Sequence, residues 1–350
     1  MSSPRFFLYS EGTDTIQCSL CPKKCILPPG GVGQCKVRSN KDGKAFLPFY
    51  GLTTAISGDP IEKKPLYHFR PGTKILSVGF IGCNLRCPFC QNWHISQSTN
   101  ELGQFCHPGD LAAAALEYSA QNPAASPSLA AKPSLAFTYS EPLVHAEFLL
   151  DCMKETRKAG ISNVLVTNGC VNSEAAEEIL DLCDAANIDL KCFSEKTYSE
   201  VLGGDLLTVI DFIRLALKKG VHVELTTLVV PGLNDSKKEL DDCLSFVKSL
   251  NDGKVPWHLS AYYPAWKWKA KATSSGFLLK LAAKARKHLA YVYAGNIANE
   301  KNDTICPACK NVLVKRLNRS VDTSGLVIKE KAGKAEYFCV ACGEKAPIRF

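Results

Sequence analysis

Short apolar runs rich in β-branched residues alternate with helix-patterned segments over residues 75–293, and this alternation constrains the fold of the 350-residue chain more than any other feature. The predicted strands, the last a further candidate, are Ile75–Ile81, Ser134–Tyr139, Asn163–Thr167, Asn187–Lys191, Val221–Val229, Trp257–Ala261 and Tyr291–Tyr293. The helical patterns fall around residues 109–120, 143–158, 173–184, 205–219, 235–250 and 275–288. Such alternation predicts parallel strands covered by helices. The expected class is therefore α/β, either an open doubly wound sheet or a full or partial (β/α)6-type barrel, with ligands at the carboxyl ends of the strands.

The overall composition is that of a folded globular protein. Hydrophobic residues make up 46% of the chain and charged residues 22%, which excludes disordered and collagen-like classes. No apolar stretch approaches the eighteen or more residues that span a bilayer, and the first ten residues lack the apolar core of a signal peptide. We therefore expect a cytoplasmic protein without a membrane partner.

Seventeen cysteines are an unusual number for a large chain without an export signal, and they indicate metal binding rather than disulfides. Eleven of them form three spaced groups: Cys18, Cys21, Cys25 and Cys35; Cys83, Cys87 and Cys90; Cys306, Cys309, Cys339 and Cys342. The remaining six are predicted to be small buried hydrophobic residues.

The central group has the spacing C-x3-C-x2-C and directly follows the first predicted strand. Structural zinc takes four protein ligands, whereas three thiolates on a [4Fe–4S] cluster leave one iron free to bind a reactant. The alternative is three buried or loosely zinc-bound cysteines. Cys83, Cys87 and Cys90 are thus candidate ligands of a catalytic iron–sulfur cluster.

At these residues the sequence resembles the radical S-adenosylmethionine (radical SAM) superfamily, in which an aromatic residue, here Phe89, precedes the last cysteine. The resemblance implies that SAM chelates the unique iron. One electron from the reduced cluster then cleaves SAM to methionine and a 5′-deoxyadenosyl radical, which abstracts hydrogen from a protein or small-molecule substrate. It also implies an electron donor such as ferredoxin or flavodoxin.

Residues at later strand ends resemble elements of the glycyl-radical activating enzymes. The candidate SAM-binding residues are Phe89, Glu141, Asn168, Asp189, Lys191, Val229 and His258. The resemblance implies that Glu141 receives the ammonium group of SAM, and that Asp189 and Lys191 lie near its carboxylate and ribose. His258, in the sixth strand, is a candidate contact for adenine. Each position taken alone also fits a capped turn or a surface ion pair.

A closer resemblance covers almost the whole chain. The motifs that carry it are Cys18-x2-Cys-Pro-Lys-Lys-Cys25, Gly33-Gln-Cys35, Gly58-Asp-Pro-Ile-Glu-Lys-Lys-Pro-Leu-Tyr-His68 and Cys90-Gln-Asn-Trp-His-Ile-Ser96. They look like those of the AmmeMemoRadiSam system radical SAM enzymes, relatives of pyruvate formate-lyase activating enzyme. This resemblance implies Memo-like and Ammecr-like partner proteins. The chain departs from the family pattern in the lysine-rich insert of its C-terminal segment.

The two outer cysteine groups predict small metal-bound segments on either side of the barrel. Cys306-x2-Cys309 and Cys339-x2-Cys342 resemble a zinc ribbon, with residues 312–317 and 324–331 forming a hairpin between them; an iron centre or free thiols are the alternatives. For Cys18, Cys21, Cys25 and Cys35 we expect zinc, with a second iron–sulfur cluster that feeds electrons inward as the alternative. The expected domains are residues 1–70, 71–299 and 300–350.

Positive charge is concentrated near the C-terminus. Residues 264–350 carry 17 basic and 6 acidic side chains, and residues 266–271 interleave tryptophan with lysine. The +5 charge of residues 301–350 is expected to hold an acidic partner or substrate near the barrel mouth. It also keeps open a second function of a different class, an iron–sulfur or zinc scaffold that binds nucleic acid through the basic segment.

Overall fold

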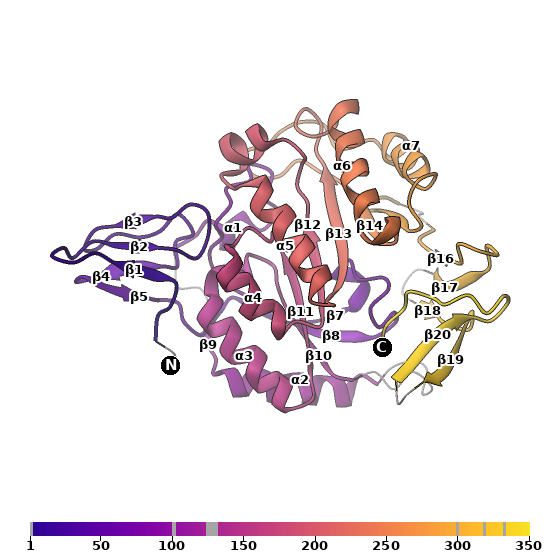
Figure 1. Cartoon of the computed structure of the whole chain (residues 1–350), viewed down its shortest axis with the longest axis horizontal. Helices are drawn as coiled ribbons and strands as arrows, with labels where there is room; N and C mark the ends of the chain where they lie inside the picture. The colour runs from indigo at the N-terminus through magenta and orange to yellow at the C-terminus, as the bar shows by residue number, and fades with distance from the viewer. Residues whose placement is uncertain (1–2, 100–102, 124–131, 299–300, 318–319, 332–333) are drawn as a thin grey trace.

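The computed structural model describes residues 3–99, 103–123, 132–298, 301–317, 320–331 and 334–350. Its centre is an eight-stranded sheet in the order β15-β14-β13-β12-β11-β10-β8-β7 (Figure 1). The strands are β7 (Ala55–Pro60), β8 (Lys74–Gly79), β10 (Ser134–Thr138), β11 (Ser162–Thr167), β12 (Ala185–Asp189), β13 (His222–Val229), β14 (Trp257–Ala261) and β15 (Val292–Gly295). β8 and β10 to β15 pair in parallel, and β7 pairs antiparallel with β8 at one edge.

The strand order decides between the two expected architectures. The parallel strands follow one another in sequence order without the reversal that defines a doubly wound sheet. β15 and β7 are the two edges of the sheet, so the described strands form a partial barrel rather than a closed one. This confirms the predicted α/β class. Because β7 belongs to this sheet, the barrel begins before the expected boundary at residue 71.

The parallel strands are buried along most of their length, which explains why they read as continuous apolar runs, whereas the antiparallel edge strand β7 is largely exposed. All five residues of β10 are buried, as are five of the six residues of β8. Right-handed crossovers between sequential parallel strands place their helices on one face of the sheet. The principal helices are α2 (Pro108–Gln121), α3 (Ala146–Lys158), α4 (Ser173–Asp181), α5 (Leu206–Lys218), α6 (Lys237–Ser249) and α7 (Ser275–Ala285).

Shorter elements complete the connections between the barrel strands. They are β6 (Leu52–Thr53), η1 (Ile61–Lys63), α1 (Trp93–Ser96), β9 (Gln104–Phe105), η2 (Pro142–His145), the π-helical turn η3 (Thr197–Leu202) and η4 (Asn251–Gly253). Side chains cap two of the long helices: Asp205 accepts a hydrogen bond from the Thr208 N–H, and Ser236 accepts one from the Glu239 N–H. None of the described helices is long and apolar enough to cross a membrane.

An N-terminal segment precedes the barrel. It contains an antiparallel sheet of β1 (Phe7–Tyr9), β2 (Ile16–Cys18) and β3 (Ile26–Leu27), and a hairpin of β4 (Ser39–Lys41) and β5 (Lys44–Phe46). A fully buried ion pair joins Arg38 of this segment to Glu147 of α3 at 2.7 Å. The Asn172 N–H, just after β11, donates to the Leu20 carbonyl. These contacts fix the segment against the carboxyl ends of the barrel strands.

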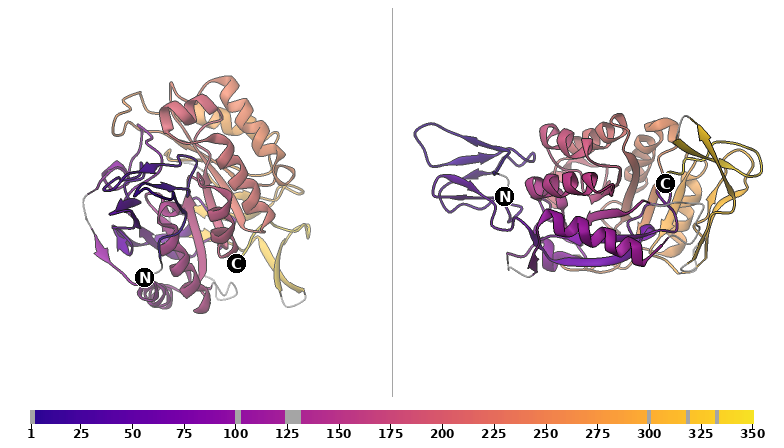
Figure 2. Two further views of the ribbon diagram at one scale, coloured as in Figure 1. Left: turned by 60° about the vertical axis from the view of Figure 1, so that its left-hand side comes forward. Right: turned by 90° about the horizontal axis from the view of Figure 1, so that it is seen from below.

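The C-terminal segment lies at the opposite end of the molecule from the N-terminal segment (Figures 1 and 2). Its strands are β16 (Thr304–Ile305), β17 (Val312–Leu317), β18 (Ser320–Asp322), β19 (Leu326–Lys331) and β20 (Lys334–Cys339). The Arg349 N–H donates to the His68 carbonyl, just ahead of β8, and Arg316 donates to the Tyr67 carbonyl. The segment is thus attached at the amino ends of the strands, and the expectation that its charge lies near the barrel mouth is wrong.

The predicted hairpin between residues 312–317 and 324–331 is also wrong. β17 pairs with β16 and β18, whereas β19 pairs with β20. The physical reason is that each Cys-x2-Cys turn is closed by its own neighbouring strands: β16 and β17 flank the first turn, and the second lies between β20 and a bridge from Phe338 to Lys345.

Candidate active site

A cavity of about 260 Å3 opens at the carboxyl ends of the barrel strands. The residues that line it are Cys83, Leu85, Cys87, Phe89, Cys90, Gln91, Asn92, Ser96, Tyr139, Ser140, Glu141, Asn168, Asp189, Lys191, Thr226, Leu228 and Ser260. The structure therefore brings the three central cysteines and five of the seven candidate SAM-binding residues to one cavity.

The cysteine loop directly follows β8 and is held closely by its surroundings. The Leu85 N–H donates to Cys83 Sγ at 3.3 Å, and Ser96 Oγ lies 3.3 Å from Cys90 Sγ. Burial raises the pKa of Cys83 well above its usual value and that of Cys87 to about 12. These sulfur atoms therefore become thiolates only when a cation compensates their charge. This donor set fits an iron–sulfur cluster with one site left open.

Glu141 is a buried carboxylate that ties two strand ends together. Its Oε1 accepts hydrogen bonds from the Leu143 N–H at 3.0 Å and Thr167 Oγ1 at 2.6 Å, and its Oε2 accepts from the Asn168 N–H at 2.8 Å. The three hydrogen bonds act to lower the pKa of Glu141, but burial has the larger effect and raises it to about 7. A carboxylate offers about four acceptor positions, so one remains for a cationic ligand in the cavity.

Asp189 and Lys191 form a pair in the cavity wall, with Nζ 2.5 Å from Oδ2. Burial acts against the charged form of Lys191, but the neighbouring Asp189 carboxylate outweighs it and raises the pKa of the lysine. Asn234 donates to the Lys191 carbonyl at 2.7 Å, which fixes the loop after β12. Both side chains are partly accessible, at 27% for Asp189 and 19% for Lys191, so they can meet a ligand.

Asn168, just after β11, connects the SAM-binding candidates to the cysteine loop. Its Nδ2 donates to Asn84 Oδ1 at 2.9 Å and lies 3.7 Å from Cys83 Sγ. Phe89 is 3% exposed and contributes its ring to the cavity wall. Both residues therefore line the same cavity as the three central cysteines.

Val229 and His258 lie outside the cavity. Val229 is fully buried in the core, and its neighbour Leu228 lines the cavity instead. His258 is the second residue of β14, near the amino end of the strand, where its Nε2 contacts Glu224 Oε2 at 2.7 Å. Ser260, two residues further along the same strand, occupies the cavity wall. The predicted contact of His258 with adenine is therefore wrong. The ligand site lies at the carboxyl ends of the strands, and His258 lies near the amino end of β14.

Tyr139 is a cavity residue that the sequence analysis missed. It adopts a left-handed φ of 69°, which is unfavourable for a tyrosine and requires support from its neighbours. Its hydroxyl donates to Asp59 Oδ2 at 2.6 Å, and Asp59 also binds Lys64 at 2.7 Å. Burial raises the pKa of Asp59, but Lys64, the Tyr139 hydroxyl and Lys63 together outweigh it and lower the value to about 2. The Gly58–His68 motif thus supports the cavity from β7.

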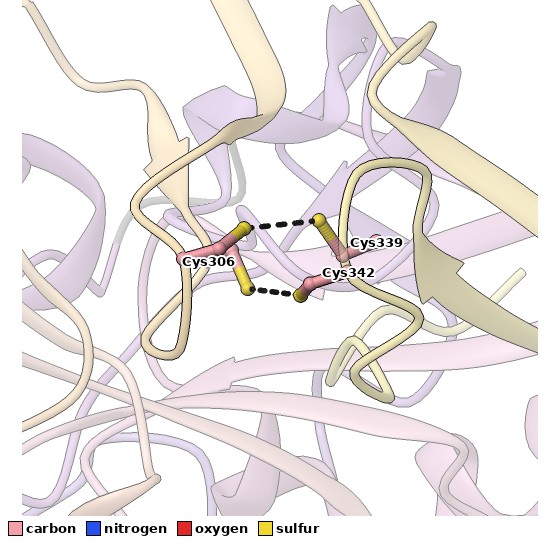
Figure 3. Close-up of side chains that lie close together, drawn as sticks. Cys306, Cys339 and Cys342 are labelled. Carbon is pink, nitrogen blue, oxygen red and sulfur yellow. Dashed lines mark hydrogen bonds between the residues drawn. The ribbon is translucent and has the colours of Figure 1, made fainter.

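The C-terminal cysteines form a compact four-thiol group (Figure 3). The sulfur atoms of Cys306 and Cys342 are 3.7 Å apart, and those of Cys309 and Cys339 are 3.6 Å apart. Tetrahedral zinc with Zn–S bonds of about 2.3 Å requires sulfur atoms about 3.8 Å apart. Among the described residues, this is the one group of metal-ligating side chains whose ligand atoms all lie within 4.8 Å of one another. The group therefore fits a structural metal ion with no open position.

Comparisons with known proteins agree with this geometry. The family model described as "Radical SAM superfamily" matches residues 78–244, from β8 into α6. The uncharacterized protein MJ0808 of Methanocaldococcus jannaschii is 33% identical over 338 residues, which cover 95% of each chain.

The comparisons also include more distant relatives and solved structures. The pyruvate formate-lyase-activating enzyme of Clostridium pasteurianum is 26% identical over 195 residues, covering 54% of this chain and 76% of the relative. Among solved structures, a radical SAM methyltransferase from Sphaerobacter thermophilus aligns with a TM-score of 0.49 at 12% identity, over 84% of this chain and 76% of that one. The chain belongs to the radical SAM superfamily and is an enzyme of the radical SAM type.

Proposed function

We propose that the cavity binds SAM beside a [4Fe–4S] cluster held by Cys83, Cys87 and Cys90, and that the resulting radical abstracts hydrogen from a protein or small-molecule substrate. The observation that carries the proposal is the convergence of three thiols with Glu141 and the Asp189–Lys191 pair on one cavity of about 260 Å3. When bound, the cluster supplies the electron that cleaves the sulfonium of SAM to methionine and a 5′-deoxyadenosyl radical.

The residues of this chain bind and orient the cofactor in this proposal. Glu141 accepts hydrogen bonds from the amino end of SAM, and Lys191 and Asp189 bind its carboxylate and ribose. Asn168 holds the cysteine loop against the end of β11 through Asn84. Phe89 and Leu228 supply apolar wall that excludes water from the reacting centre.

The finer assignment follows from the sequence motifs. The motifs around Cys18, Gly58 and Cys90 support membership of the AmmeMemoRadiSam system enzymes, acting with Memo-like and Ammecr-like proteins in the cytoplasm. The reductant in this proposal is a low-potential protein such as ferredoxin or flavodoxin. The three-part organisation, residues 1–70, 71–299 and 300–350, separates metal-binding outer segments from the barrel, with β7 contributed to the barrel by the first of them.

The C-terminal thiols are assigned to one structural zinc ion. Their sulfur spacing supports zinc, and the small core around them, which includes Leu313, Val314 and Tyr337, is too thin to order the segment alone. In this proposal the zinc holds the segment against the amino ends of the barrel strands.

The alternative nucleic-acid function loses part of its support, because several residues that suggested it are used in internal contacts, although Lys267, Lys269 and Lys271 are exposed. Trp266 stacks on Trp93 with ring centroids 6.3 Å apart, and Trp268 donates to the Pro231 carbonyl. Arg316 donates to the carbonyls of Asn302 and Tyr67. Trp266, Trp268 and Arg316 are therefore parts of the fold.

A reductive cleavage assay tests the proposed function. Anaerobically reconstituted protein is reduced with dithionite and given SAM, and 5′-deoxyadenosine is measured. We expect cleavage in the wild type and in the control Cys106→Ser, whose thiol is half-buried outside the cavity. Cleavage should be absent from Cys87→Ser. Equal cleavage by Cys87→Ser and the wild type would contradict the proposal.

A further inference from the structure

The four N-terminal cysteines form a second thiol group at the same end of the barrel as the active site. Cys18 ends β2, Cys21 and Cys25 lie in the turn before β3, and Cys35 lies in the loop before β4. We propose that these residues bind a second [4Fe–4S] cluster, through which electrons reach the active site. The redox role, though not the metal site, rests on the function proposed above.

The spacing of the sulfur atoms distinguishes the two candidate metals. A single zinc ion draws four sulfur atoms to about 3.8 Å from one another, as the C-terminal group shows. In a [4Fe–4S] cluster each thiolate binds a different iron, so the sulfur atoms lie farther apart. Within the described ranges, neither the active-site cysteines nor the N-terminal four form a group gathered within 4.8 Å. The N-terminal group therefore resembles the cluster ligands and not the zinc ligands of the same chain.

Gly33 lies beside two of the N-terminal sulfur atoms. A Cβ atom added to Gly33 would lie 3.6 Å from Cys35 Sγ and 3.9 Å from Cys25 Sγ. Cys18 and Cys35 are buried, and Cys21 and Cys25 are half-buried. A side chain at position 33 would contact both sulfur atoms and press on the Arg38 carbonyl at 3.2 Å, so glycine keeps this side of the two thiols uncovered.

A buried cation accompanies the group. Arg38 is 1% exposed, and its Nε donates to Cys18 Sγ at 3.3 Å while its Nη1 binds Glu147 at 2.7 Å. Hydrogen bonds to ligand sulfur are one of the means by which a protein stabilises the reduced form of an iron–sulfur cluster.

One side chain separates the N-terminal group from the active site. The Asn84 amide contacts the Cys21 thiol on one side and lies 4.0 Å from Cys83 Sγ on the other. Asn84 itself is buried, with 2% of its surface exposed. The Cys35 carbonyl also packs on Gly82, where an added Cβ would lie only 2.4 Å from the oxygen. The two thiol groups are therefore neighbours across one buried side chain, and this short separation suits electron transfer.

The electron count of this route balances with one external donor. A ferredoxin- or flavodoxin-type protein loses one electron, which enters at the N-terminal thiol group and passes across Asn84 to the active site. There the electron enters the C–S bond of the sulfonium, which breaks to methionine and a carbon radical. Each thiol-bound centre returns to its starting oxidation state.

Metal counting on anaerobically reconstituted protein tests the proposal. We expect about eight iron atoms and one zinc ion per chain in the wild type and in Cys106→Ser. The double variant Cys21→Ser/Cys25→Ser and the triple variant Cys83→Ala/Cys87→Ala/Cys90→Ala should each lose half of the iron and keep the zinc. Mössbauer spectra should show the [4Fe–4S] type in both variants.

Other metal counts would overturn the proposal. About four iron atoms with two zinc ions in the wild type assign zinc to the N-terminal group, and four iron atoms with one zinc ion show that its thiols bind no metal. The metal content of the wild-type protein distinguishes these outcomes, so the test does not depend on whether the variants fold. Wild-type protein with four iron atoms that still cleaves SAM would contradict only the second cluster, whereas eight iron atoms without SAM cleavage would contradict only the proposed function.

Discussion

At the scale of single residues, Glu141 is the side chain whose chemistry is most sensitive to its surroundings. Three hydrogen bonds favour its carboxylate form, yet burial holds its pKa at about 7. The folded pKa exceeds the unfolded value, so the charged form destabilises the ligand-free protein. That contribution increases as pH rises from about 4.5 to about 7. A cation in the cavity reverses the effect by pairing with the carboxylate.

The affinity for SAM should therefore rise with pH between about 6 and 8, as Glu141 ionises. Glu141→Gln keeps the shape but removes the charge, so it should weaken binding by roughly ten- to hundredfold, the loss of one charged hydrogen bond of about 1.5–3 kcal/mol. Calorimetric titration with SAM at several pH values measures both effects.

The matched control is Glu117→Gln, an exposed residue of α2, which should bind SAM like the wild type. An unchanged affinity in Glu141→Gln would show that this carboxylate serves only to join the ends of β10 and β11.

At the scale of elements, the strands and helices were predictable because burial on both faces leaves a continuous apolar signal. The predicted strand at 257–261 matches β14 residue for residue, and the others differ by a few residues at their ends. Contacts between distant loops left no such signal. The support of Tyr139 by Asp59 and the packing of Cys35 on Gly82 depend on how β7 and the N-terminal segment fold back onto the barrel. The position of His258 could have been inferred from the sequence. It is the second residue of its predicted strand, and ligands bind at the opposite, carboxyl end of such strands.

The junction between the N-terminal segment and α3 depends on the buried Arg38–Glu147 pair. Glu147→Gln leaves the guanidinium without its counter-charge in the interior, so the variant should lose about 3–5 kcal/mol of stability. Urea denaturation followed by circular dichroism measures the change.

Glu155→Gln is the control on the same helix, since it removes an exposed pair with Lys158 and should cost less than about 1 kcal/mol. Equal urea denaturation midpoints for Glu147→Gln and Glu155→Gln would mean that the buried Arg38–Glu147 pair does not attach the N-terminal segment to α3.

At the scale of the whole molecule, the two outer cysteine segments occupy opposite ends of the barrel (Figure 1). The N-terminal segment contacts the cavity loops, whereas the C-terminal segment contacts the amino ends of the strands. This separation could not be read from the sequence, which places both segments outside the barrel but does not fix the end to which each is attached.

Removing the zinc should therefore unfold the C-terminal segment locally and leave the SAM cavity intact. Cys342→Ser, at an exposed ligand position, should lose one zinc ion per chain and expose residues 304–350 to proteolysis. It should still cleave SAM at a rate close to that of the control Cys106→Ser. A variant that keeps its zinc, or one that loses SAM cleavage altogether, would contradict this division of roles.

The central claim is that SAM binds directly to the metal centre held by Cys83, Cys87 and Cys90. Electron–nuclear double resonance on dithionite-reduced protein with SAM labelled with 15N at its amino group tests it most directly. The account predicts a nitrogen hyperfine coupling to the cluster spin in the wild type, with no coupling in Cys87→Ser. A wild type that binds labelled SAM without any such coupling, or a coupling that persists in Cys87→Ser, would contradict the account.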